Sequence, residues 1–177
     1  MGSRNTDSAV LSYSILRIPR AFALSGALRR TLALLLLILG AGRSVVAQAG
    51  VVSNRDLQFG AVTRGIPAAV TPADPIKSGQ WTITAPAGAK VQLRLTLPTS
   101  LVGPASASML FDVGKNDASV QTPNVAPISF NPSDHINYNF SGSTTAVVRL
   151  GGRVVPGAAQ ASGAYANTVI LEMRILN

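Results

Sequence analysis

Apolar and polar residues alternate through most of the chain after Gly50. In "QWTITAPAGAKVQLRLTLP" the residues Trp81 and Ile83 alternate with polar ones ahead of the turn segment 86–89. Four apolar residues alternate after that turn, namely Val91, Leu93, Leu95 and Leu97. Successive side chains of a strand point to opposite faces of a sheet. The segment therefore predicts a β-hairpin with one buried face and one solvated face, and Trp81 is expected in the core.

The same rhythm returns in short runs that are separated by glycine, proline and other turn residues. These runs lie at Leu57–Phe59, Met109–Val113, Ile128–Phe130, Ile136–Phe140, Thr145–Leu150 and Ala164–Leu176. No part of residues 50–177 has the sustained i, i+3, i+4, i+7 apolar spacing of an amphipathic helix. About seven or eight short strands with frequent turns predict an all-β fold, a β-sandwich.

The last run is the longest, and it continues to the end of the sequence. One of its faces carries Tyr165, Val169, Leu171, Met173 and Ile175. We expect this strand to insert between two neighbours and to bury these five side chains, at ~1.5–3 kcal/mol for each large apolar group. Its loss would then unfold a domain that is stable by only ~5–15 kcal/mol. The alternative is an edge that stays open until a partner binds.

Residues 1–49 have the features of a leader for export. Arg29 and Arg30 precede an apolar run that begins at Leu32, and the small residues Ala47 and Ala49 suit a signal peptidase. Cleavage before Gly50 is predicted, which leaves residues 50–177 as one β-sandwich domain. An uncleaved membrane anchor is the alternative, but the apolar run ends at Gly42, short of the ~20 residues that a spanning helix needs.

Charge and cysteine content exclude several classes of protein. The formal charge is +8, but the leader holds six arginines and one acid, so residues 50–177 are only mildly basic. A nucleic-acid interface needs basic residues clustered on one face, and those of the mature segment are scattered along the sequence. No nucleic-acid partner is expected. The chain has no cysteine, which removes disulfides, thiolate metal sites and cysteine nucleophiles.

Candidate chemistry is sparse in this sequence. His135 is the single histidine, and its neighbour Asp134 would point to the opposite face of a strand, so the two do not imply a catalytic dyad. No Gly-x-Ser-x-Gly motif is present. The segment "DVGKND" offers oxygen ligands from Asp112, Asn116 and Asp117, but calcium takes six to eight oxygens, and a turn explains the segment. No catalytic residue, cofactor or metal site is predicted, and the protein is not expected to be an enzyme.

Three segments resemble a family of secreted bacterial proteins of unknown function that is similar to spore coat protein U and to chaperone–usher pilins. They are "DLQFGAVTRG", "GQWTITAPAGAKVQLRLTLP" and "LGGRVVPGAAQASGAYANTVILEMRIL", and the resemblance extends over nearly all of residues 54–176. It implies an immunoglobulin-like, pilin-like sandwich whose missing strand is supplied by a partner. The residues that it places on the partner-binding terminal strand are Gly163, Tyr165, Val169, Leu171, Met173 and Ile175.

Two features depart from the pilin pattern. The next-to-last residue is Leu176, where the pilins usually have an aromatic residue. Only Gly50–Asp56 precedes the first expected core strand, with Val51 and Val52 as its apolar residues, and seven residues span at most about 25 Å. Polymerisation by donation of an N-terminal strand is therefore less well supported than the fold.

The sequence thus favours an exported, non-enzymatic structural protein, a pilin-like or coat-like subunit of a fimbrial or other cell-surface assembly. Its expected partners are a periplasmic assembly chaperone or identical subunits, through strand addition. Its expected location is the periplasm or the cell surface, without membrane contact once the leader is removed. The alternative is a monomeric secreted binding module of the same fold, which holds a sugar or a protein through loops at one end of the sandwich.

Overall fold

Twelve strands and one short 3-10 turn make up the protein in a computed structural model that describes residues 49–176. The prediction of an all-β sandwich is confirmed. The strands outnumber the predicted seven or eight because several are only three or four residues long. The predicted leader, except for Ala49, lies outside the described residues. Within them, no helix is long and apolar enough to cross a membrane.

The strands form three antiparallel sheets. The five-stranded sheet has the order β1 (Gly50–Arg55), β3 (Gly79–Thr84), β10 (Thr145–Leu150), β7 (Ala118–Gln121) and β8 (Ile128–Phe130). The three-stranded sheet has the order β12 (Ile170–Leu176), β4 (Lys90–Thr96) and β9 (His135–Asn139). The four-stranded sheet has the order β2 (Ala68–Val70), β11 (Gly152–Val155), β6 (Ser108–Asp112) and β5 (Ser100–Val102).

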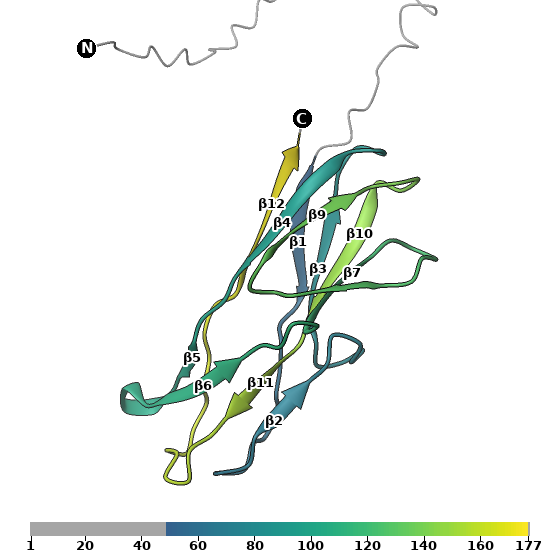
Figure 1. Ribbon diagram of the computed structural model, residues 1–177. Coiled ribbons are helices and arrows are strands. Elements are labelled where there is room, and N and C mark those ends of the chain that lie inside the picture. Colours follow the sequence, from purple (N-terminus) through teal and green to yellow (C-terminus); the bar gives the residue numbers. More distant parts are fainter. Residues whose placement is uncertain (1–48, 177) are drawn as a thin grey trace, which may run out of the picture. The chain divides into compact units, whose positions relative to one another are not determined.

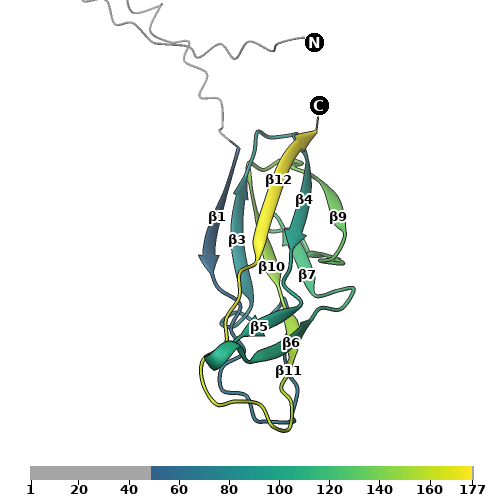
Figure 2. The same cartoon turned by 90° about the vertical axis from the view of Figure 1, so that its left-hand side faces the viewer.

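The five-stranded and three-stranded sheets are the two layers of the sandwich, and the main core lies between them (Figure 1). Strand β4 leads into β5 and strand β10 leads into β11, so both layers continue into the four-stranded sheet. There β11 pairs with β6, and β6 with β5, which joins the two layers on one side of the molecule. Figures 1 and 2 show this junction at the end away from the C-terminus.

Alternation along the strands matches burial closely. In β3 and β10 every second residue is buried, and β4 buries Val91, Leu93 and Leu95. Trp81 is 8% exposed and belongs to the core cluster, as its position in the pattern predicts. A second, smaller cluster forms around Met109, Phe111 and Val154 in the four-stranded sheet.

The predicted hairpin of residues 80–97 is wrong. Strand β3 pairs with β1 and β10, whereas β4 pairs with β12 and β9, so the turn between them crosses from one layer to the other. Both strands direct their apolar faces into the same core from opposite sides. The alternation therefore gave the correct buried residues and the wrong hydrogen-bonding partner.

The start of the domain also differs from the expectation. The first strand is β1, which pairs with β3, while Leu57 and Phe59 follow it in a segment without regular structure. Strands β2, β5, β7 and β11 were not predicted. They have three or four residues each, which is too few to display an alternating pattern.

Candidate functional site: an open seam and its pocket

The terminal strand β12 is an edge strand. It pairs with β4 from Ile170 to Leu176, and no other described strand pairs with it. The expectation that it inserts between two neighbours and buries its whole apolar face is therefore wrong. Leu171 is 8% exposed, but Ile175 is 42% exposed, and Tyr165, Val169 and Met173 are half-buried. Alternation identifies the face that points inward, but it does not show whether a strand has one neighbour or two.

Strand β1 is the edge of the opposite layer. It pairs with β3 and, among the described strands, with no other. Val51 lies opposite Ile83 and shares its inward face, yet it is 36% exposed. Cα atoms of β1 and β12 approach within 8 Å, but no ladder joins the two strands. We call the gap between them the open seam, and Figure 2 shows both strands on this side of the sandwich.

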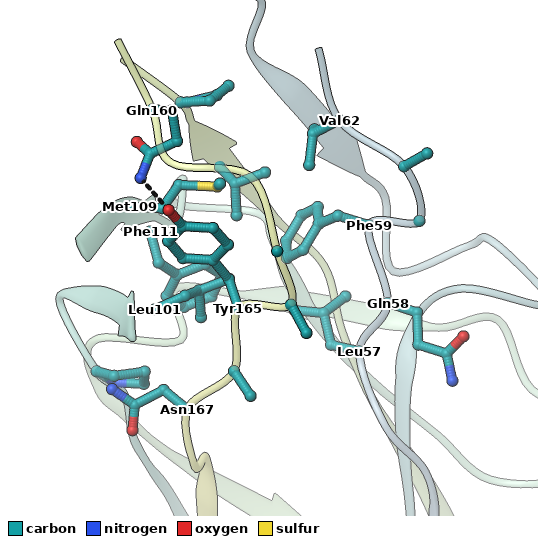
Figure 3. A pocket seen from close by; sticks show the side chains of 18 of the residues that line it. Leu57, Gln58, Phe59, Val62, Leu101, Met109, Phe111, Gln160, Tyr165 and Asn167 are labelled. Carbon is teal, nitrogen blue, oxygen red and sulfur yellow. Dashed lines mark hydrogen bonds between the residues drawn. The ribbon is translucent and has the colours of Figure 1, made fainter. Parts of the chain in front are cut away.

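The open seam continues into a pocket of about 720 Å³. Where the seam meets the pocket, it is bordered by residues 56–64, which follow β1, and by residues 160–169, which precede β12. Buried Met109, Phe111 and Val154 contribute to its lining. Half-buried apolar side chains complete the lining, among them Leu57, Phe59, Val62, Leu101, Tyr165 and Val169. Figure 3 shows Leu57, Phe59 and Val62 on the opposite side of the pocket from Tyr165 and Gln160.

Aromatic and polar contacts hold this pocket in shape. The rings of Phe59 and Phe111 meet edge to face, with centroids 6.1 Å apart. Gln160 Nε2 donates to Tyr165 Oη at 2.6 Å and to the Ser108 carbonyl oxygen at 3.0 Å. The Tyr165 hydroxyl donates to the carbonyl oxygen of Ala161 at 2.9 Å. The segment before β12 is thereby fixed to β6 without a regular strand.

Further polar groups border the pocket. Arg64 Nη2 donates to Ser162 Oγ at 2.7 Å and so connects the two borders of the pocket. Asn167 Nδ2 donates to the carbonyl oxygen of Ser100 at 2.7 Å, and Ala166 and Val102 form an isolated bridge. The pocket is therefore apolar inside and polar at its borders, a composition typical of sites that bind an organic ligand or an apolar side chain.

Gly163, which the resemblance placed on the partner-binding strand, has a structural role that the geometry explains. Its φ of +143° is a conformation that favours glycine, and a Cβ at this position would overlap the ring of Pro104. The six residues expected on one partner-binding strand thus divide into two groups. Leu171, Met173 and Ile175 lie in β12, whereas Gly163, Tyr165 and Val169 belong to the pocket lining.

The residues that were considered for catalysis or metal binding do not form a site in the fold. His135 lies on the exposed face of β9, and Asp134 Oδ2 accepts a hydrogen bond from Asn131 Nδ2 at 2.9 Å. Asp112 forms an ion pair with Arg153 at 2.9 Å, and Asp117 Oδ2 accepts the N–H of Gly114 at 2.6 Å. Within residues 49–176 no group of three or more His, Cys, Asp or Glu side chains is arranged to hold a metal ion.

One carboxyl group has a shifted pKa. The N–H groups of Lys77 and Ile76 both donate to Asp74 Oδ1 at 2.8 Å, and they lower the pKa of this carboxyl. Asp74 lies in the turn before β3, which Arg55 of β1 also binds by donating to the carbonyl oxygen of Ser78. The shift therefore belongs to a turn that supports the fold.

Sequence reasoning missed most of the pocket. Leu57 and Phe59 were assigned to a strand, and Val62, Arg64 and Gln160 were not singled out. A signal was present, because Gly60 separates Leu57 and Phe59 from Val62, and a glycine inside a run of alternating residues often marks an interruption of the strand. No family model matches this chain, and no curated protein matches it.

Proposed function

We propose that this protein is an exported, non-enzymatic structural subunit that binds an extended segment of a partner protein along the open seam. The observation that carries the proposal is the free edge of β12. Strand β12 pairs with β4 on one side, no described strand pairs with its other side, and that side continues into an apolar pocket. The occupant would add a strand beside β12. An assembly chaperone or an identical subunit could supply it, in the periplasm or at the cell surface.

Backbone hydrogen bonding favours such an addition. An edge strand presents a row of N–H and C=O groups that an incoming strand can pair with. Side-chain burial favours it as well, because Val51 and Ile175 on the two sides of the seam are 36% and 42% exposed although both point inward. Covering them would remove apolar surface from water at about 25 cal/mol for each Å².

The width of the seam indicates where the partner enters. Paired strands lie about 4.8 Å apart, so a strand hydrogen-bonded to both β1 and β12 would need them about 9.6 Å apart. Some Cα atoms of these strands are within 8 Å of one another. We therefore expect the partner to bind first at the pocket and to displace β1 outward if it extends along the whole seam.

The proposed function includes no catalytic role. His135 lies on an exposed strand face, and the neighbouring Asp134 carboxylate is bound by Asn131. The pocket beside the open seam is lined mostly by apolar side chains. Such a lining suits recognition of a side chain or an apolar molecule better than proton transfer or nucleophilic attack.

The proposal can be tested with a photo-crosslinking amino acid placed at Ile175, and at Val125, an exposed residue between β7 and β8, as a control. The protein is expressed with its leader in a bacterial host, and envelope proteins are analysed after irradiation. Covalent adducts are expected from position 175 and not from position 125. A chain that stays monomeric and free of adducts at position 175 would contradict strand addition.

Export is tested separately, by mass spectrometry of the protein recovered from the envelope. A chain that starts near Gly50, the first residue of β1, is expected. An intact leader in the membrane fraction would contradict cleavage.

The pocket also favours a second candidate function, a monomeric binding module. Its volume of about 720 Å³ lies within the range of ~300–1,000 Å³ that is typical of small-molecule sites. A chain that is monomeric by light scattering, and whose melting temperature rises with small apolar ligands, would support this function over the structural one.

A further inference from the structure

The outward face of the three-stranded sheet has an unusual composition. Register places its side chains in three rows across the strands. The rows are Glu172–Arg94–His135, Arg174–Gln92–Asn137 and Leu176–Lys90–Asn139. We call these nine residues the polar face. The inward side chains of the same strands, such as Leu93 and Tyr138, are buried in the core.

Positive charge predominates on the polar face. Lys90, Arg94 and Arg174 are all exposed, and Glu172 is the one acid among the nine residues. Within the described part of the chain, no ion pair or side-chain hydrogen bond engages these three cations, since the ion pair found there joins Arg153 to Asp112. Their N–H donors are therefore free to bind an external anion.

The spacing of the cations suits an extended ligand. Lys90, Gln92 and Arg94 are alternate residues of one strand, so neighbouring members lie about 6.8 Å apart along it. Arg174 lies opposite Gln92 on β12, about 4.8 Å away across the sheet. The three cations are therefore spread along the sheet and not gathered at one point, an arrangement that a chain with repeated acidic groups can follow.

The remaining polar residues indicate the kind of chain. The amides of Gln92, Asn137 and Asn139 each offer both donors and acceptors, which match sugar hydroxyl groups. Gln92 Nε2 and Asn137 Oδ1 are 3.5 Å apart, so this amide pair is only weakly bonded to itself. Single-stranded nucleic acid would favour several exposed aromatic rings for stacking, but the ring of Tyr138 is on the buried side, and the imidazole of His135 is the one aromatic ring of the polar face.

We propose that the polar face binds a linear anionic polysaccharide, with Arg94, Arg174 and Lys90 on its carboxylate or sulfate groups and the amides on its hydroxyls. This site lies on the outer surface of the layer whose edge borders the open seam. It uses the outward side chains of β12, whereas strand addition uses the backbone edge and the inward side chains of that strand, so the protein can hold both partners at once.

The test measures binding of polygalacturonate to the protein as isolated after export, by titration calorimetry at low and physiological salt. The double variant Arg94→Gln/Arg174→Gln should bind about tenfold more weakly, because two charge-assisted contacts are lost. The double variant Lys77→Gln/Lys115→Gln removes the same charge from exposed turns away from the polar face, and its affinity should change less than about twofold. Neutral dextran should not bind.

A gain-of-affinity variant keeps the test valid if the double variant folds poorly. Glu172→Gln removes the one acid of the polar face and should strengthen binding. Equal losses in both double variants, no effect of Glu172→Gln, or tighter binding of a DNA oligonucleotide of equal charge would each overturn the proposal.

Discussion

The ring of Tyr165 lies directly against Gly103, so that a Cβ on Gly103 would come within 3.0 Å of three atoms of the ring. The next residue, Pro104, packs in the same way against Gly163. Two residues after β5 thus interlock with two residues of the segment that leads to β12. This contact fixes one wall of the pocket and explains why a Gly-x-Tyr sequence precedes the terminal strand.

Substitution of Gly163 by Ala should destabilise the protein by about 1–3 kcal/mol, because both the φ of +143° and the contact with Pro104 oppose a side chain. Urea unfolding measures the loss. Gly142→Ala is the matched control, since Gly142 also has a positive φ of +71° but has no heavy atom within 4 Å of the added Cβ. An equal loss in both variants would mean that contact with Pro104 has no effect.

Substitution of Tyr165 by Phe keeps the ring and removes the hydroxyl that binds Gln160 and Ala161. The free energy of unfolding should fall by about 0.5–1.5 kcal/mol, the usual net value of a hydrogen bond. Tyr138→Phe should have a smaller effect, because its hydroxyl makes no hydrogen bond to the described residues. Chemical denaturation of both variants compares the two directly, and a larger loss for Tyr138→Phe would contradict the assignment.

The charge of Asp74 should make stability depend on pH. The N–H groups of Lys77 and Ile76 lower its pKa in the folded state, so its contribution is present above the pKa of the unfolded chain. That contribution is lost as the pH falls through the lowered pKa of the folded protein. Asp74→Asn should therefore be less stable than the wild type at pH 7, with the difference shrinking in acid. Thermal melts from pH 7 to pH 2 measure it, and a constant difference would exclude the charge as the cause.

Two substitutions in β12 should separate folding from partner binding. Leu171→Ala removes a side chain that is 8% exposed and should cost about 2–5 kcal/mol. Ile175→Lys places a charge on a residue that is 42% exposed, so stability should change by less than about 0.5 kcal/mol. Photo-crosslinked adducts, with the crosslinker at Met173, should nevertheless disappear in the Lys variant, because a lysine at a sheet edge opposes strand addition.

The matched control for the second change is Val125→Lys, at a loop residue that is 54% exposed and distant in sequence from both edges of the seam. It should retain the adducts. If Ile175→Lys retains them as well, the edge of β12 is not the binding surface.

The fold class and much of the core follow from the alternation along the chain, because a period of two residues is a local property that each strand displays alone. Trp81, Ile83, Val91, Leu93 and Leu95 are buried as the alternation predicts. The polar residues that alternate with these apolar ones in the same strands are exposed or half-buried for the same reason. Long strands such as β4 were found in this way, whereas of the described strands with three or four residues only β8 was.

The pairing of the strands is a property of the tertiary structure, and the edges, the pocket and the polar face depend on that pairing. Strands β3 and β4 are neighbours in sequence but lie in different layers, and β12 has one neighbour where two were expected. Arg174 is 80 residues from Arg94 in a sequence whose basic residues look scattered, yet both lie on one exposed face. Pairing is fixed by hydrogen bonds and packing between distant segments, and the alternation within a strand contains no information about which distant segment that will be.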